Sequence, residues 1–336
     1  MAAIKMAQYG TKHGHASGKL LAMQRNENVE MVGVFEPDPQ RRAELEGQDG
    51  PFAGVRWFDN KEEMLGDGSI AAIASEGDNH ESLGQTEEIV EAAKHVWYDK
   101  PGGDDWAHWL RVVERVQEKK VYLQMGYMLR YSPAFSQVAE WVRSGFLGDI
   151  FSLRAHMSAY LPAETLSVPG KHVGGIFYDL ASHMLDQVVW LMGRPQKVTS
   201  FLRHDSMPAS SYVDNGLGVF EFERGIAFID IAAMETRPAA RCFEVYGTNG
   251  SAIITEPFEP GKQIRLCLDQ ARGGYQEGVQ TVTTQGSDRQ ELYELALVAF
   301  LKTIQGEQEP DRSLEHEVLV QETLLRSTGA IAEAGV

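Results

Sequence analysis

The chain has 336 residues, of which 43% are hydrophobic and 24% charged, values that fit a folded protein of two domains and argue against disorder. The formal net charge of −17 at pH 7 repels phosphate backbones and anionic membrane surfaces, so we expect no nucleic-acid partner and no membrane partner. Two cysteines, Cys242 and Cys267, are too few for a disulfide framework or a four-thiolate zinc site, and the sequence shows neither a signal peptide nor a membrane span, so we expect a reduced, cytoplasmic protein.

Short apolar runs alternate with amphipathic stretches over the first 125 residues. Strands are expected at 4–9, 31–35, 70–74, 95–99 and 121–125. Helices are expected at 16–24, from about residue 40, at 86–94 and around 106–116. This alternation predicts βαβ units and a parallel sheet, whose strand carboxyl ends meet at one edge, where a ligand should bind.

The pattern changes after about residue 125. Helices are expected at 132–145, 179–192, 289–305 and 314–332, with an extended segment at 150–159. Strand-like runs joined by turns fill residues 197–268, and Thr248-Asn249-Gly250 suits a tight hairpin. These features predict a largely antiparallel sheet, one face on a core and the other available to a second subunit. We therefore expect a Rossmann domain over residues 1–124 and a second domain over 125–336.

The first strand is followed by a turn that reads Gly-Thr-Lys-His-Gly-His-Ala over residues 10–16. Glycine at this point allows the backbone to approach a pyrophosphate, which rests on the amino terminus of the next helix. If Gly10 opens the pattern G-x-G-x-x-G, Lys12 and His15 stand at its second and third glycines, and the alternative is a turn that binds nothing. Lys12 could bring a positive charge to the diphosphate. The candidate cofactor-binding residues of this loop are Gly10, Thr11, Lys12, His13, Gly14 and His15.

Glu36 ends the second strand and is a second candidate for cofactor binding. A carboxylate there accepts hydrogen bonds from the ribose of NAD and repels the extra phosphate of NADP. The alternative is a solvated loop carboxylate before Pro37. Arg41 and Arg42 lie close by and could pair with a 2′-phosphate, so we predict NAD with NADP still possible.

Lys100 precedes Pro101 and falls at the carboxyl end of the strand expected at 95–99. Proline biases the preceding residue towards extended geometry, which projects the lysine over the sheet edge. A lysine beside a nicotinamide can stabilise a developing alkoxide or transfer a proton. The alternative is a surface lysine before a turn.

The helix expected at 179–192 carries Asp179, His183 and Asp186 at i, i+4 and i+7, on one helical face. A carboxylate one turn from a histidine can orient it for acid/base work, or Asp179 could pair with Lys100. The alternatives are a capping aspartate and a buried structural histidine. Asp179 and His183 could also join other histidines as metal ligands, but that set has no recognisable spacing, and we predict no metal.

With these residues described, the sequence resembles the Gfo/Idh/MocA family (glucose–fructose oxidoreductase, inositol dehydrogenase, rhizopine catabolism) over nearly its whole length. The matching segments are the turn at Gly10, Asp38-Pro39-Gln40-Arg41, His80, Ala92-Ala93-Lys94-His95-Val96, Asp99-Lys100-Pro101, the stretch from Gly126 to Phe135, Gly145 to Gly148, Gly174 to Asp186, and Gly247-Thr248-Asn249-Gly250.

The resemblance implies an amino-terminal Rossmann domain, a second α/β domain with an open, mostly antiparallel sheet, and a homodimer or homotetramer. It implies that Lys100 contacts the nicotinamide ribose and the substrate hydroxyl, that His183 is the acid/base, and that Asp179 positions the substrate or the lysine. It also places Ser75 and His80 among the cofactor-binding residues.

Three departures from the family pattern stand out. Lys12 replaces the second glycine, Glu76-Gly77 stands where the family usually has a proline after a Ser or Thr such as Ser75, and Asp99 replaces a glutamate. The first puts ordinary pyrophosphate docking in doubt, and the second suggests a different loop on the nicotinamide side.

The resulting expectation is an NAD(P)-dependent dehydrogenase or reductase that acts on a sugar, inositol or sugar derivative. Aromatic and hydrogen-bonding side chains suit such a substrate, and the candidates are Tyr127, Arg130, His156, Tyr160, His172 and Tyr178. One alternative is an NAD-dependent glycosidase that oxidises the sugar transiently and eliminates the aglycone. The other is a sensor that binds cofactor or sugar without reaction.

Overall fold

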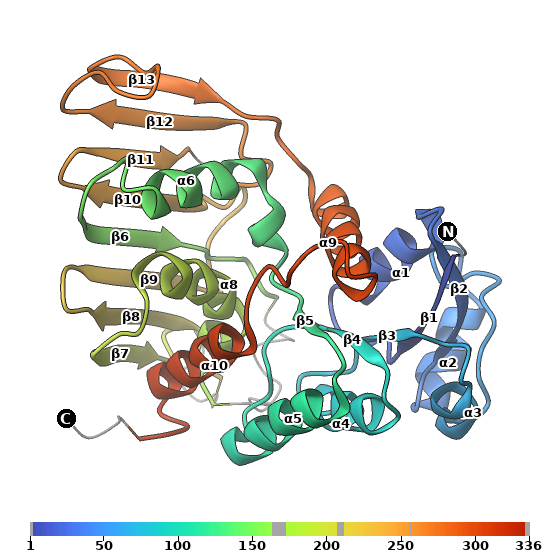
Figure 1. Ribbon diagram of the computed structural model, residues 1–336. Coiled ribbons are helices and arrows are strands. Elements are labelled where there is room, and N and C mark those ends of the chain that lie inside the picture. Colours follow the sequence, from blue (N-terminus) through green and yellow to red (C-terminus); the bar gives the residue numbers. More distant parts are fainter. Residues whose placement is uncertain (1–2, 163–172, 207–211, 256, 333–336) are drawn as a thin grey trace. The chain divides into compact units, whose positions relative to one another are not determined.

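The computed structural model describes residues 3–162, 173–206, 212–255 and 257–332 (Figure 1). The chain forms two compact units. The first unit comprises Met1–Gly126 and Tyr293–Leu314, and the second comprises Tyr127–Leu292 and Glu315–Val336. The boundary predicted after residue 124 lies close to the end of the first segment, and residues 293–314 group with the first unit.

The first unit contains a parallel sheet of five strands in the order β2-β1-β3-β4-β5. Its strands are β1 (Ile4–Tyr9), β2 (Val29–Phe35), β3 (Ala72–Ser75), β4 (His95–Tyr98) and β5 (Leu123–Met125). Its helices are α1 (Ala16–Arg25), α2 (Pro39–Glu46), α3 (Lys61–Gly66), α4 (Ser82–Glu91), α5 (Trp106–Lys119) and the part of α9 (Arg289–Ile304) from Tyr293 onwards. A single parallel bridge between Val34 and Trp57 continues the sheet beyond β2.

The strand order creates the binding edge of this unit. The chain moves from β1 outwards to β2 and then returns to β3 on the other side of β1, so the crossovers diverge between β1 and β3. Ligands of open α/β sheets bind at such a switch point, outside the carboxyl ends of the strands. The parallel sheet predicted from alternating strands and helices is confirmed, and the loops after β1, β2, β3 and β4 belong to this edge.

The second unit contains an eight-stranded sheet in the order β13-β12-β11-β10-β6-β9-β8-β7, antiparallel except for the β6–β9 pair. Its strands are β6 (Ile150–His156), β7 (Lys197–Arg203), β8 (Asn215–Glu221), β9 (Ile226–Ala232), β10 (Cys242–Gly247), β11 (Gly250–Ile254), β12 (Gln263–Leu268) and β13 (Gly278–Thr283). Its helical elements are the 3₁₀ turn η1 (Met128–Tyr131), α6 (Pro133–Arg143), α8 (Gly175–Met192) and α10 (Leu314–Thr328).

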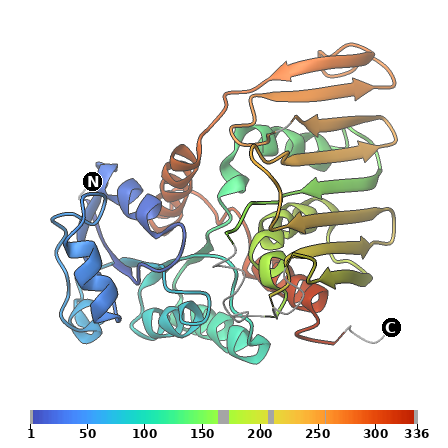
Figure 2. The ribbon, with the colours of Figure 1, turned by 180° about the vertical axis from the view of Figure 1, so that it is seen from behind.

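The sequence pattern of this sheet explains its layers. Side chains of β8 and β9 alternate between buried and partly exposed, as expected for a sheet with one face on a core. Helices α6 and α8 pack on that face, and the strand order can be followed from behind in Figure 2. The predicted mostly antiparallel sheet is confirmed, including the hairpin at Thr248-Asn249, which joins β10 to β11.

Several boundaries differ from those expected. Helix α3 was not predicted, because its six residues bury only Met64 and show too few turns for a helical period, although Asn60 caps it. Strand β13 was not predicted either, because it is a largely polar strand whose single partner is β12. Helix α8 begins at Gly175 instead of Asp179, and Gly174 before it has φ 97°.

Among the described residues, no helix is both long and apolar enough to cross a membrane. Cys242 and Cys267 are both free thiols.

Candidate active site

The loop after β1 is built around Gly10. This residue has φ 84°, its amide donates to the carbonyl of Phe35, and a Cβ atom added there would lie 2.7 Å from the amide nitrogen of Gly77. The position therefore requires glycine both for its conformation and for the close approach of the loop after β3. The backbone of His13 also donates to the carbonyl of Glu76, so the two loops form one packed edge.

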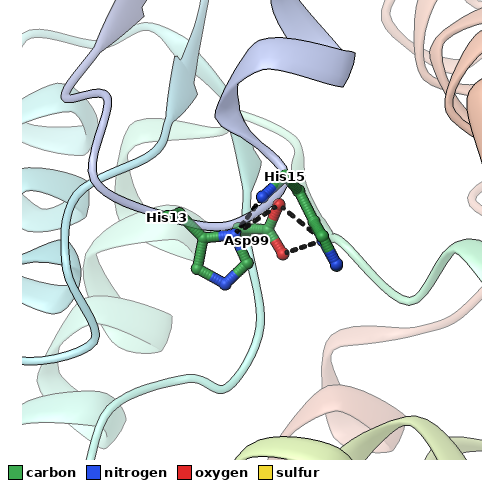
Figure 3. A group of neighbouring side chains, drawn as sticks. All are labelled: His13, His15 and Asp99. Atoms are coloured by element: carbon green, nitrogen blue, oxygen red, sulfur yellow. Dashed lines mark hydrogen bonds and ion pairs between the residues drawn. The ribbon is translucent and has the colours of Figure 1, made fainter. Parts of the chain in front are cut away.

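His13 and His15 turn inwards from this loop towards Asp99 (Figure 3). Nδ1 of His15 lies 3.0 and 3.2 Å from the two carboxylate oxygens of Asp99 and donates to them. Nε2 of His13 lies 3.1 Å from the carbonyl oxygen of Lys100, and because a carbonyl only accepts, this nitrogen carries the proton. Nδ1 of His13 accepts the backbone N–H of His15.

A second layer of charge lies beneath these histidines. Lys19 of α1 is almost fully buried, hydrogen-bonds Glu76 and the carbonyl of Trp97, and lies 3.3 Å from Asp99 and 4.3 Å from the centre of the Trp97 ring. Burial raises the pKa of Glu76 well above its usual range. Burial also opposes the ionisation of Asp99, but the charges of His13, His15 and Lys19 outweigh it and hold the pKa of Asp99 well below its usual range. We call Lys19, Glu76, Asp99, His13 and His15 the buried cluster.

Lys12 of the same loop is turned towards carboxylates of the protein. Its ammonium lies 3.0 Å from Glu81 and 3.4 Å from Asp38, and the hydrogen bond to Glu81 raises the pKa of Lys12. If Lys12 is to place its charge beside a diphosphate, as the sequence suggested, its ammonium must leave these two ion pairs.

Glu36 directly follows β2 and is 4% exposed. Its carboxylate accepts the hydroxyl of Thr11 at 2.6 Å and the amide of Asp38 at 3.0 Å, which fixes its direction at the edge of the sheet. A carboxylate has capacity for about four hydrogen bonds, so two ribose hydroxyls can still be accepted. Of the neighbouring arginines, Arg42 is paired with Glu46.

Ser75 and His80 follow β3 and have different surroundings. The hydroxyl of Ser75 is buried, donates to the carbonyl of Ser82 and accepts from Thr86. His80 is exposed in the turn before α4. A cofactor-binding role stays a prediction for both residues.

Lys100 is 3% exposed and its backbone is held from two sides. Its amide donates to Oδ1 of Asp99 at 2.8 Å, and its carbonyl accepts from His13. The peptide bond to Pro101 is cis. The sequence predicted Lys100 at the edge of the sheet. Its main chain is hydrogen-bonded there to His13, in the loop that follows β1.

In the second unit, α8 carries Asp179, His183 and Asp186 as predicted, but the three side chains have different surroundings. His183 is buried, with its ring edge-on to Tyr127 at a centroid distance of 6.2 Å. Asp179 is partly exposed near the start of the helix, and its charge contributes to raising the pKa of Tyr212, behind the larger effect of burial. Asp186 is fully buried and bound to other protein groups.

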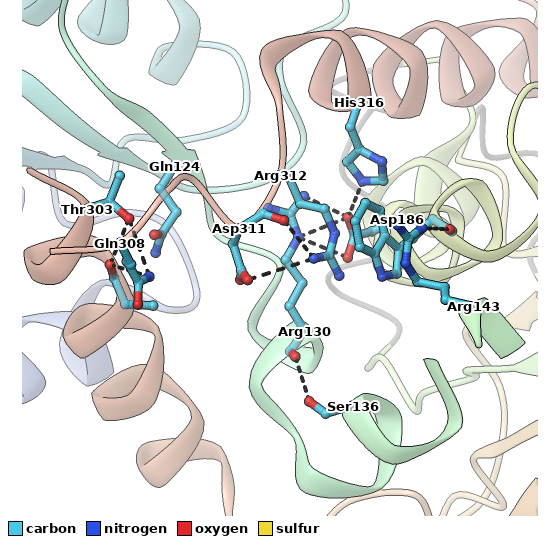
Figure 4. Close-up of polar contacts among 12 residues, drawn as sticks. Gln124, Arg130, Ser136, Arg143, Asp186, Thr303, Gln308, Asp311, Arg312 and His316 are labelled. Carbon is cyan, nitrogen blue, oxygen red and sulfur yellow. Dashed lines mark hydrogen bonds and ion pairs between the residues drawn. The ribbon is translucent and has the colours of Figure 1, made fainter. Parts of the chain in front are cut away.

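Asp186 belongs to a buried ionic network with Arg130 (Figure 4). The guanidinium of Arg130 makes three contacts of 2.6–3.0 Å to Asp186 and two of 2.7 and 2.8 Å to Glu317 of α10. His316 adds a contact of 2.8 Å to Asp186. These contacts give Arg130 a structural role between η1, α8 and α10, and its predicted role in substrate binding stays a prediction.

The other predicted substrate-binding residues are spread over the second unit. Tyr127 and Tyr178 are buried, and burial raises the pKa of Tyr127 well above its usual range. His156 on β6 pairs with Asp230 at 2.7 Å, a hydrogen bond that raises the pKa of His156. Tyr160 is half-exposed, and His172 lies outside the described residues.

Within the described part of the chain, two groups of side chains are spaced closely enough to hold a metal ion. They are His13, His15 and Asp99 in the first unit and Asp186, His316 and Glu317 in the second. In each group a protein cation already lies against the carboxylate, the ammonium of Lys19 in the first and the guanidinium of Arg130 in the second. Neither arrangement favours a metal.

A parallel sheet with a glycine turn after β1 and a carboxylate after β2 is the arrangement of a dinucleotide-binding domain, and here a unit with a large antiparallel sheet follows it. Residues 6–127 match the model of an oxidoreductase family with an NAD-binding Rossmann fold, and residues 135–253 match the GFO/IDH/MocA C-terminal domain. The chain belongs to this oxidoreductase family, as the resemblance predicted.

Individual relatives are distant but cover much of the chain. The 1,5-anhydro-D-fructose reductase of Ensifer adhaerens is 25% identical over 294 residues, which are 86% of this chain and 85% of that enzyme. The scyllo-inositol 2-dehydrogenase (NAD(+)) of Bacillus subtilis strain 168 is 28% identical over 214 residues, 59% of each chain. A structure of levoglucosan dehydrogenase with NADH and levoglucosan has a TM-score of 0.81 at 17% identity and covers 97% of each chain. That structural likeness shows the shared fold.

The sequence did not indicate Lys19 and Glu76 as members of this edge. In the sequence, Lys19 has the pattern of any lysine in a helix. Glu76 stood out only because it departs from the family pattern. The one available signal was that departure, since an acidic residue directly after a buried strand needs a buried cation as a partner.

Proposed function

We propose that the protein is an NAD-dependent oxidoreductase that transfers a hydride between the nicotinamide and a hydroxyl-bearing carbon of a sugar, an inositol or a sugar derivative. The observation that carries the proposal is the convergence of the Gly10 loop, Glu36 and Lys100 at the carboxyl edge of the parallel sheet. The names of the relatives, a reductase of an anhydrosugar and a dehydrogenase of an inositol, support the substrate class.

The residues at this edge fit a dinucleotide. Gly10 brings the backbone close to the loop of Gly77, and the amino terminus of α1 offers backbone N–H groups to a pyrophosphate. Glu36 is held in place to accept ribose hydroxyls, and the pairing of Lys12 and Arg42 with carboxylates leaves less positive charge for the 2′-phosphate of NADP. NAD, when bound, supplies the carbon that accepts or donates the hydride.

Lys100 is proposed to act on the substrate hydroxyl. Its backbone is fixed by Asp99 and His13, so the start of its side chain is positioned before any ligand arrives. An ammonium removed from bulk water stabilises an oxygen that gains negative charge during hydride transfer more strongly than one in solution does. Lys100 would therefore hold the hydroxyl and stabilise the alkoxide character that develops on it.

His183 and Asp179 are proposed to serve the same reaction from the second unit. His183 is the acid/base, because it is buried within a helix that fixes its ring against Tyr127. Asp179 positions the substrate or the lysine. Tyr127, Tyr178 and His156 are proposed as groups that contact the sugar.

We also propose that the protein forms a homodimer or homotetramer through the face of the large sheet opposite α6 and α8. Phe201 on β7 and Ile226 on β9 are exposed there, on the opposite parity to the buried side chains of their strands. Light scattering on the purified protein measures the oligomeric state, and a monomer at all concentrations contradicts this point.

The test is a screen of sugars, inositols and anhydrosugars with NAD and with NADH, in which the absorbance of NADH and the mass of the products are both followed. The proposal expects stoichiometric formation or consumption of NADH. It also expects Lys100→Met to lower kcat/KM by roughly 10²–10⁴-fold. Lys5→Met is the matched control, because Lys5 lies near the amino end of β1 and pairs with Glu30. Release of a sugar from a glycoside without net NADH would instead support the glycosidase, and full activity of Lys100→Met would contradict the role of the lysine.

A further inference from the structure

Lys19 brings a positive charge into the interior of the first unit, as a member of the buried cluster. Its side chain is 1% exposed, and lysine is rarely buried to this extent unless it is paired. Its ammonium hydrogen-bonds the carboxylate of Glu76, the first residue after β3, and the carbonyl of Trp97 in β4 at 3.2 Å. It also lies 3.3 Å from Oδ2 of Asp99, the first residue after β4. An ammonium has three N–H groups, so each can face one of these oxygens.

Asp99 connects this ammonium to the backbone of Lys100. Its Oδ1 accepts the N–H of Lys100 at 2.8 Å, while its Oδ2 faces Lys19. Two imidazoles also contact this carboxylate: Nδ1 of His15 lies 3.0 and 3.2 Å from its two oxygens, and Nδ1 of His13 lies 3.4 Å from Oδ2. Lys19 is therefore the neighbour that brings a positive charge to Asp99 without protonation of an imidazole.

Glu76 holds the ammonium from the loop after β3. Its amide donates to the carbonyl of Tyr9 at 2.7 Å, and its carbonyl accepts the amide of His13 at 3.0 Å, so its backbone is fixed. Its second carboxylate oxygen lies 3.9 Å from Nδ1 of His13. Burial raises the pKa of Glu76 well above its usual range, whereas the charges around Asp99 outweigh burial and hold the pKa of Asp99 well below its usual range. Asp99 is thus the anion that balances Lys19.

Net stability is a weak reason to bury such a pair. Apolar residues of similar volume can often replace a buried ion pair at little cost, because desolvation of the charges offsets their attraction. An apolar pair does not, however, fix the direction of a neighbouring carboxylate. The contacts of Lys19 join the ends of β3 and β4 and hold Asp99 between them. The carboxylate of Asp99 in turn holds the N–H of Lys100, which lies outside the buried cluster.

We infer that Lys19 is a positioning residue for the reaction: it fixes the carboxylate of Asp99, which holds the backbone of Lys100, and so sets where the Lys100 ammonium meets the substrate hydroxyl. The inference rests on the proposed function, because it requires the role proposed for Lys100. Lys19 acts through Asp99, since its own side chain is buried. Without the ammonium, Asp99 is left to its two imidazole neighbours, and the N–H of Lys100 loses a fixed acceptor.

A double-mutant cycle on kcat/KM separates positioning from general damage, with Lys19→Met, Lys100→Met and both changes together. Methionine keeps most of the length of the lysine side chain without its charge. Lys19→Met is expected to lower kcat/KM by roughly 10–100-fold, since a shift of about 1 Å in a reacting group can cost that much. In the Lys100→Met background it should change kcat/KM little, because no ammonium is left to misplace. A merely structural loss would lower activity by the same factor in both backgrounds.

A second measurement needs neither NAD nor a substrate. In protein with isotopically labelled lysine, amide hydrogen exchange followed by NMR reports how firmly Asp99 holds the N–H of Lys100. This exchange should be faster in Lys19→Met than in the wild type. The matched control is Lys94→Met, because Lys94 is also buried but hydrogen-bonds the carbonyl of Asp67 at 2.6 Å, next to the amino end of β4. Lys94→Met should leave both kcat/KM and the exchange of the Lys100 amide unchanged.

If Lys19→Met alone does not fold, the combination of Lys19→Met with Glu76→Leu replaces the pair by apolar side chains and is expected to fold. It should show the same loss of kcat/KM and the same faster exchange. Unchanged exchange of the Lys100 amide, or equal losses in both backgrounds of the cycle, would overturn this inference and leave the proposed function standing. Full activity of Lys100→Met, or no hydride transfer by the wild type, would overturn the proposed function and this inference together.

Discussion

Replacing Arg130 with methionine tests whether this arginine holds the second unit together or binds substrate. Its guanidinium makes five contacts of 2.6–3.0 Å to the carboxylates of Asp186 and Glu317. Methionine fills similar space but leaves two buried carboxylates with no cation between them. Removing one partner of a buried ionic network typically costs about 3–5 kcal/mol, because the remaining charges stay desolvated.

We therefore expect Arg130→Met to lower the free energy of unfolding by about 3–5 kcal/mol. For a unit of this size, that corresponds to a fall in Tm of roughly 6–20 °C. Chemical denaturation followed by circular dichroism gives the free energy, and calorimetry gives Tm. The control is Arg224→Met, since Arg224 forms an exposed pair with Asp149 and its loss should cost about 1 kcal/mol or less.

The reasoning would be refuted if Arg130→Met unfolded with the same free energy as the wild type and instead raised KM for the substrate. That result would support the earlier interpretation of Arg130 as a substrate-binding residue. A large loss of stability with an unchanged KM in the remaining folded enzyme supports the structural role.

Two further changes test the loop after β1 and the pairing on β6. Gly10→Ala forces an alanine into φ 84° and places Cβ 2.7 Å from the amide of Gly77, so we expect a loss of about 1–3 kcal/mol and of NAD binding. Gly14→Ala meets no atom within 4 Å and should be nearly neutral in thermal unfolding, and equal effects of the two changes would contradict the steric argument. The hydrogen bond to Asp230 raises the pKa of His156 above its unfolded value, so the stabilisation is fully present below about pH 6.5 and is lost as the pH rises through the folded-state pKa. His156→Gln should thus be less stable than the wild type in acid, with a gap that narrows in alkaline buffer; a gap that widens with pH would show that the sign is wrong.

The fold could be predicted from the sequence because its signals are local. Alternation of apolar and amphipathic stretches indicated the parallel sheet of the first unit, and strand-like runs joined by turns indicated the antiparallel sheet of the second. The order of strands in the large sheet could not be predicted. In that sheet β6 pairs with β9 and β10, which come from distant parts of the chain.

The position of a residue along an element was also easier to predict than its partners. Glu36 and Lys100 were expected at the ends of their strands. Glu36 directly follows β2, and Lys100 is the second residue after the end of β4. The pairing of Lys19 with Glu76 and Asp99 was not predicted, because a lysine inside a helix has the same local pattern whether it faces solvent or carboxylates in the loops after β3 and β4. The same limit applies to Arg130, whose two carboxylate partners lie on α8 and α10.

The central claim is that the edge formed by the Gly10 loop and Glu36 holds NAD. The most direct test is calorimetric titration of the purified protein with NAD and with NADP, repeated with Glu36→Ala. We predict that the wild type binds NAD at least about tenfold more tightly than NADP, because a second phosphate beside a fixed carboxylate is repelled. The preference should shrink in Glu36→Ala. Failure of the wild type to bind either nucleotide, or tighter binding of NADP than of NAD, would contradict the claim.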